Sequence, residues 1–177
     1  MPNDDRFDPL AHLPVLRRYA RALTRDAAAA DDLVQDALVR AYDKRHTFRG
    51  GRLGGWLLSI VYSTFLNNRR SRLAEQARAE RLAEVSPQSA EPAQEHAVRL
   101  AQIQTAFLEL PEDQRAALHL VAVEGLAYAD AAAVMNVPLG TLMSRLARAR
   151  ATLRRVEAVR GEAASGTRLR VVGGNDD

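Results

Sequence analysis

The sequence predicts an all-α fold of two small helical domains, and three observations support this prediction. The 177 residues are 47% hydrophobic and 27% charged, which fits a globular protein of one or two modest domains. Aromatic residues make up only 5% of the chain, and Ala and Leu dominate it. Apolar residues recur at intervals of three and four and rarely alternate with polar ones, as in amphipathic helices.

Three helices are predicted in the first domain, which spans residues 10–72. They cover about residues 12–23, 31–44 and 53–72. Pro14 fits the first turn of the first helix, and an Arg-Gly-Gly-Arg segment at 49–52 separates the second helix from the third. Trp56 opens the third helix, and a lone Trp at helical spacing is expected to be mainly a core residue.

Residues 73–97 differ in texture from the sequence on either side of them. They are charged and Ala-rich at first, then rich in Ser and Pro, with few side chains that could fill a core. We interpret them as a flexible linker between two domains, with helix possible only at its start. Fully stretched, a linker of this length would span roughly 80 Å.

The second domain, residues 98–160, is predicted to contain four helices. Leu100, Ile103 and Phe107 mark the first of these, and Pro111 ends it. The other three cover about residues 114–123, 128–135 and 139–156. Residues 161–177 have little apolar pattern, and we expect a disordered tail there.

Within the second domain, residues 125–150 have the spacing of a helix-turn-helix. A short helix is followed by a turn at 136–138 and by a longer helix, and the small residues at 131–133 let the two helices cross closely. The longer helix has a polar face, with hydroxyl groups near its start and guanidinium groups behind them. The candidate DNA-reading residues on this face are Thr141, Ser144, Arg145 and Arg148.

Such a face suits base edges and phosphates in the DNA major groove, and the planar Arg side chain suits them better than Lys does. An ordinary amphipathic helix with a solvated basic face would explain the charges equally well. It would not explain the short helix, the turn and the hydroxyl positions together. The combination therefore predicts double-stranded DNA as a partner.

Composition also excludes several classes of function. The chain has no cysteine, which excludes disulfides, thiolate zinc sites and cysteine nucleophiles. Its four histidines are far apart in sequence, so we expect no metal site, and nothing predicts a cofactor. No apolar run approaches the ~20 residues of a membrane span, and the acidic residues 1–9 do not resemble a secretory signal. We therefore expect a cytoplasmic protein.

Two blocks of the sequence resemble the extracytoplasmic-function (ECF, group IV) sigma factors of bacterial RNA polymerase. The first block is Ala30-Asp-Asp-Leu-Val-Gln-Asp36, followed by Trp56 with Leu57. The second contains Gly125, Leu126 and Tyr128, then Pro138-Leu-Gly-Thr-Leu-Met-Ser-Arg145 and Arg148-Ala-Arg150. The resemblance covers about residues 10–72 and 98–156, and two motifs in the family's order are more specific than either alone.

The resemblance implies a subunit that is not an enzyme, because the polymerase does the chemistry. The first domain, similar to sigma region 2, would bind core RNA polymerase and read the minus-ten promoter element. The second, similar to region 4, would read the minus-thirty-five element and so direct transcription initiation. Residues 19–26 and 63–67 look like the general-stress-response branch, which implies an anti-sigma protein as a partner and a sigma-like response regulator that releases it.

The candidate polymerase-binding residues are Asp31, Asp32, Leu33, Gln35 and Asp36. Acids at a helix start commonly cap free amides and favour the helix dipole, and we expect Asp31 to do so. We expect Asp32, Gln35 and Asp36 to form an exposed acidic face beside Leu33. Such a face suits a basic partner surface, and the family resemblance supports this interpretation.

The candidate minus-ten residues lie on the other face of the third helix. They are Tyr62, Ser63, Asn67, Arg69, Arg70 and Arg72. Amide and hydroxyl groups followed by arginines suit an unstacked base and its phosphates, although a solvated helix end would look the same without the resemblance. Ser63, Asn67, Ala131 and Met143 depart from residues common in the family, which leaves the promoter sequence open.

Two other functions are compatible with parts of this pattern. A sigma mimic would sequester an anti-sigma factor without binding DNA, but it has no need of the basic face that carries Arg145 and Arg148 and usually comes attached to a receiver domain. A plain repressor would leave the acidic segment 31–36 without a role. An enzyme has no support, because the sequence offers no nucleophile with its base, phosphate loop or ligand cluster.

Overall fold

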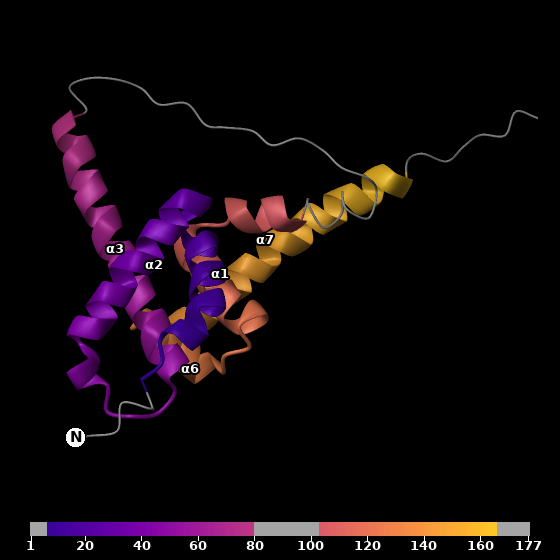
Figure 1. Cartoon of the computed structure of the whole chain (residues 1–177). Helices are drawn as coiled ribbons and strands as arrows, with labels where there is room; N and C mark the ends of the chain where they lie inside the picture. The colour runs from indigo at the N-terminus through magenta and orange to yellow at the C-terminus, as the bar shows by residue number, and fades with distance from the viewer. Residues whose placement is uncertain (1–6, 80–102, 166–177) are drawn as a thin grey trace, which may run out of the picture.

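The computed structural model describes residues 7–79 and 103–165, and their regular structure is entirely helical (Figure 1). The first domain contains η2 (Leu10–His12), α1 (Leu13–Thr24), α2 (Ala27–Asp43), η3 (Arg45–Thr47) and α3 (Leu53–Ala79). Residues 103–109 are helical and lead into α5 (Glu112–Leu118), η4 (His119–Val123), α6 (Tyr128–Met135) and α7 (Leu139–Ser165). The all-α prediction is confirmed for these ranges. Most of the predicted linker and the end of the predicted tail lie outside them.

The helix α2 begins earlier than predicted. The chain turns at Arg25, whose φ is +63°, and Asp26 then caps α2 by accepting a hydrogen bond from the Ala29 amide at 2.7 Å. The expectation that Asp31 caps this helix is therefore wrong. Asp31 lies one turn inside the helix and pairs with Arg17 on α1 at 3.5 Å.

The helix α3 is separated from α2 by two glycines in a left-handed conformation. Gly50 and Gly51 have φ of +89° and +96°, which side chains with a Cβ rarely adopt. The Arg-Gly-Gly-Arg segment is thus an interruption, as predicted. The helix then continues to Ala79, past the predicted end at residue 72.

The helix-turn-helix is present with the predicted bounds for its first helix, α6. This helix ends at Asn136, which has a φ of +50°, and Asn is among the residues that tolerate this region. The Pro138 carbonyl accepts hydrogen bonds from the amides of Thr141 and Leu142 at 3.0 and 3.1 Å, which starts α7. The helix α7 extends to Ser165, beyond the predicted end near residue 156.

The two domains pack against each other and share one hydrophobic core. Buried residues of this core include Leu16, Leu23 and Val61 from the first domain and Leu120 and Leu142 from the second. The helix α1 contacts α2 and α3 on one side and α5 and η4 on the other, and α3 contacts α6. Figure 1 shows α1 at the centre of this body. The sequence had left the packing of the two domains open.

Candidate functional site

The acidic face of α2 is exposed, with one change from the predicted set. Asp32, Gln35 and Asp36 are all accessible to solvent, and Asp36 accepts a hydrogen bond from the Asn68 amide group at 3.2 Å. Leu33 is only 3% exposed because it packs into the core, so it is not part of the surface as predicted. The apolar neighbour on the outside is Val39, which is 62% exposed.

The predicted minus-ten residues divide into an exposed set and one buried residue. The exposed residues of α3 are Ser63, Asn67, Arg69, Arg70 and Arg72. Tyr62 is only 7% exposed, and burial raises the pKa of its phenol, while the charge of nearby Arg145 opposes this rise. The expectation that Tyr62 lies on the outer face of α3 is therefore wrong for this arrangement of the domains.

A groove of about 1280 Å³ runs between α3 and the second domain. From α3 it is lined by Asn67, Arg69 and Arg70, among others, and from the second domain by Glu112, Asp113 and Arg145, among others. Arg69 forms an ion pair across it with the Glu112 carboxylate, with 3.0 Å between the nitrogen and the oxygen. One of the predicted promoter-reading arginines thus has an acidic partner within the protein.

On α7 the exposed face is rotated relative to the predicted one. Ser144 and Arg148 are exposed as predicted, and Thr141 is half-buried. The Arg145 side chain is only 20% exposed and pairs with Asp113 at 3.0 Å. It therefore faces the groove between the domains and not the solvent.

Sequence reasoning missed three further members of the exposed face of α7. Gly140, Met143 and Ala147 are exposed there, and Met143 has 50% of its surface accessible. The buried stripe of α7 would have located them, because Leu142, Leu146 and Ala149 place the opposite face at these positions. Leu139 follows the spacing of this apolar stripe but is 46% exposed.

Two other kinds of site are absent from the part of the chain that the structure describes. Within residues 7–79 and 103–165, no group of three or more His, Asp or Glu side chains could hold a metal ion. No helix in this part of the chain is long and apolar enough to cross a bilayer. The surfaces that remain are an acidic face on α2, an Arg-bearing face on α3 and an exposed face of α7 that carries Ser144 and Arg148. We call the last of these the recognition face of α7, after the role that the sequence predicts for it.

Known proteins show the same combination of domains. Residues 10–57 match the family described as the Sigma2 domain of PhyR, and residues 100–153 match Sigma-70, region 4. The ECF RNA polymerase sigma factor EcfG of Rhodopseudomonas palustris is 38% identical over 99% of both chains. SigM of Mycobacterium tuberculosis is 38% identical over 85% of this chain and 76% of its own. The protein belongs to the ECF RNA polymerase sigma factors.

Solved structures agree with this assignment. The sigma factor RpoE of Bartonella quintana, in complex with the anti-sigma factor NepR, is 34% identical with a TM-score of 0.72, over 85% of this chain and 94% of that one. CnrH in complex with the cytosolic domain of CnrY is 25% identical with a TM-score of 0.60, over 85% of each chain. The match to RpoE spans both domains, so it includes their relative placement.

Proposed function

We propose that this sigma factor joins core RNA polymerase through the acidic face of α2 and reads promoter DNA with α3 and α7. The observation that carries the proposal is the free recognition face of α7. It follows a helix-turn-helix turn at Asn136 and carries Ser144 and Arg148 in solvent. Helices of this kind place their first turns against base edges in the major groove.

We further propose that the protein belongs to the general-stress-response branch and binds an anti-sigma protein of the NepR kind. Two findings support this proposal. The RpoE structure that aligns with both domains of this protein is a complex with NepR. Residues 10–57 of this protein match the Sigma2 domain of PhyR. A pure sigma mimic is the weaker alternative, because EcfG aligns with the whole chain and α7 keeps an exposed Arg148.

The experiment is transcription reconstituted with core RNA polymerase and genomic DNA fragments. The wild-type protein is expected to co-purify with the core enzyme and to start transcripts at a defined set of promoters. Asp32→Arg is expected to abolish this association, because it places a positive charge in a face that we assign to a basic partner. Circular dichroism should show unchanged helix content, since Asp32 is exposed.

The matched control is Asp43→Arg, which makes the same charge change at the other end of α2. It should leave polymerase binding intact. Equal binding by wild type and Asp32→Arg would show that the acids only stabilise the helix. A protein that never binds the core enzyme but binds a NepR-type protein tightly would be a mimic, and the proposed function would be wrong.

A further inference from the structure

Polar contacts cross between the two domains in addition to the hydrophobic core that they share. One of these contacts involves Arg115 of α5, whose side chain is fully buried. It donates hydrogen bonds to the main-chain carbonyls of Ala22 and Leu23, and to that of Leu108 at 3.0 Å. Ala22 and Leu23 are in the last turn of α1, where carbonyls have no partner within the helix.

Arg115 therefore caps a helix of the other domain. Its positive charge lies at the negative end of the α1 dipole, which is a favourable position for a cation. Burial, with help from nearby Arg25, lowers the pKa of Arg115, but a guanidinium stays charged in proteins. Separating the domains would leave the Ala22 and Leu23 carbonyls without Arg115, which would keep only its acceptors in its own domain, Leu108 and Leu110.

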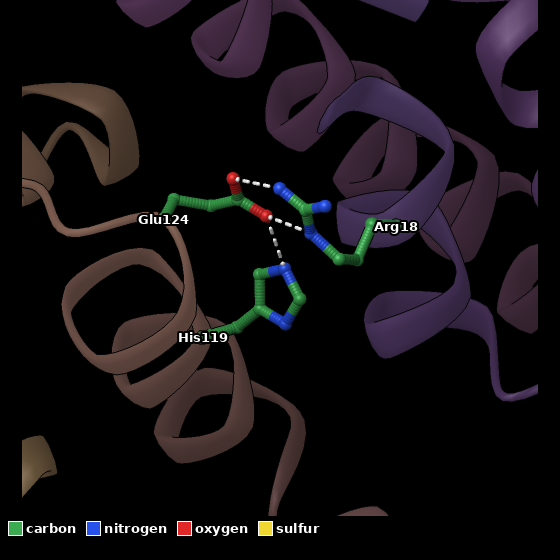
Figure 2. Close-up of polar contacts among 3 residues, drawn as sticks. All are labelled: Arg18, His119 and Glu124. Atoms are coloured by element: carbon green, nitrogen blue, oxygen red, sulfur yellow. Dashed lines mark hydrogen bonds and ion pairs between the residues drawn. The ribbon is translucent and has the colours of Figure 1, made fainter. Parts of the chain in front are cut away.

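A second contact joins α1 to the second domain one turn earlier along the helix, at Arg18 (Figure 2). The Glu124 carboxylate, only 4% exposed, accepts two hydrogen bonds from the Arg18 guanidinium at 2.7 and 2.8 Å. His119 Nε2 contacts the same carboxylate at 2.9 Å. This is a bidentate Arg–carboxylate pair between α1 and the second domain, a strong and directional kind of contact.

The interface also covers part of the promoter-reading face of α3. Tyr62 is buried beneath the second domain, and Arg69 is paired with Glu112. Glu109 and Asp113 line the same groove. A DNA strand approaching α3 would meet these carboxylates and would have to displace Glu112 from Arg69.

The other two surfaces remain accessible in the same arrangement. Asp32 and Gln35 on α2 are exposed, as are Ser144 and Arg148 on α7. The closed arrangement is thus selective, because it covers Tyr62 and pairs Arg69 on the minus-ten surface and leaves the surfaces for polymerase and for the upstream element open.

We propose that the protein inhibits its own minus-ten reading by means of an interdomain latch, defined as Arg115 of α5 with its carbonyl acceptors on α1, together with the Arg18–Glu124 pair. The latch keeps the second domain over α3, and capture of the melted strand requires the latch to open. The assignment of α3 to the minus-ten element rests on the proposed function, whereas the closure itself does not.

The closure can be tested on the full chain without polymerase. Because the protein has no cysteine, Ala28→Cys and Ala122→Cys, both at exposed positions, accept a donor and an acceptor dye on different domains. Arg18→Met removes the bidentate pair and is expected to lower energy transfer, since Arg18 is half exposed and its loss leaves the core intact. Arg17→Met is the control, because it removes the same charge but breaks only the Arg17–Asp31 pair within the first domain.

The masking of the α3 surface can be tested by measuring the fluorescence anisotropy of a labelled DNA single strand of random sequence as protein is added. Arg18→Met and Arg115→Lys are expected to bind it roughly tenfold more tightly than Arg17→Met, as follows if the open fraction rises tenfold. If Arg115→Lys loses helix content, the half-exposed Arg18 variant decides. Unchanged energy transfer and unchanged binding in Arg18→Met would overturn the latch. Failure of the wild type to support transcription would overturn only the proposed function.

Discussion

Two arginines on α7 illustrate how strongly the role of a residue depends on the direction in which its side chain points. Arg145 and Arg148 lie one turn apart, yet Arg145 pairs with Asp113 and faces the groove, while Arg148 is in solvent. A guanidinium in solvent can neutralise a DNA phosphate, whereas one already paired must first leave its carboxylate. We therefore assign the upstream contact to Arg148 and a packing role to Arg145 in the closed protein.

Replacing Arg148 by alanine tests this assignment. Binding to a promoter duplex should weaken, and the slope of log affinity against log salt should become shallower by about 0.9 if one phosphate contact is lost. Fluorescence anisotropy across a salt series measures the slope. Arg21→Ala removes the same charge from the exposed surface of α1 and should leave the slope unchanged. An equal slope for wild type and Arg148→Ala would remove Arg148 from the interface.

At the level of single helices, caps decide where helices begin and end. Asp26 fixes the start of α2 through the Ala29 amide, and the left-handed Asn136 fixes the end of α6. These positions set the direction of α2 and the angle between the two helices of the helix-turn-helix.

The stabilisation that the Asp26 cap gives to α2 can be measured. Asp26→Ala should lower the free energy of unfolding by about 1 kcal/mol, because the Ala29 amide loses its acceptor. Asp31→Ala should cost at most a few tenths of that, because its pair with Arg17 is exposed at both ends. Urea denaturation of both variants gives the comparison. A larger loss for Asp31→Ala would mean that Asp31 supports the helix after all.

Local sequence signals were sufficient to place most helices and insufficient for several of their boundaries, namely the start of α2 and the ends of α3 and α7. The bounds of α6 were predicted correctly because a Gly-containing turn precedes it and Asn136 follows it. The start of α2 was wrong because Ala27 to Ala30 have no contrast between apolar and polar faces. The periodicity therefore became visible only near residue 31.

At the scale of the whole molecule, the interface is what local patterns could not predict. Tyr62 and Arg145 were assigned to outer faces, but Tyr62 is only 7% exposed and lies near Arg145 of the second domain. Arg145 in turn pairs with Asp113 of α5. Both are long-range contacts that helical periodicity does not report. One signal of this interface was available in the sequence, namely Arg115 directly before the apolar run Ala116-Ala-Leu118. A charge next to a core segment needs a buried hydrogen-bonding partner, which here comes from the other domain.

The Arg18–Glu124–His119 cluster makes the closed protein sensitive to acid. Burial, together with Arg18, lowers the pKa of His119 against the opposing effect of Glu124, and Tyr19 packs on its ring. Burial alone would raise the pKa of Glu124, but hydrogen bonds from Arg18 and His119 produce a net lowering. Both groups thus take up protons more readily in the unfolded chain than in the folded protein.

The contribution of His119 to the free energy of unfolding is consequently expected to be fully present above its ordinary pKa of 6.5 and to be lost as the pH drops below that value. The contribution of Glu124 should be lost in the same way below its ordinary pKa of about 4.5. Urea midpoints measured across this range test the sign. His119→Gln keeps a possible donor to Glu124 but does not titrate, so the first part of the fall should disappear. A midpoint that rises on acidification would contradict the direction of both shifts.

The distance along the chain between Arg115 and its acceptor on α1 matters during synthesis. The two residues are 93 positions apart, and 36 of these positions follow Ala79, the last residue of α3, so at ordinary elongation rates of about 5–20 residues per second the ribosome needs roughly 2 to 7 seconds between completing α3 and reaching Arg115. During that time the nascent first domain has no second domain to cover it. The newborn protein therefore passes through a period in which its α3 surface is open to any single-stranded nucleic acid nearby, and translation itself ends that period.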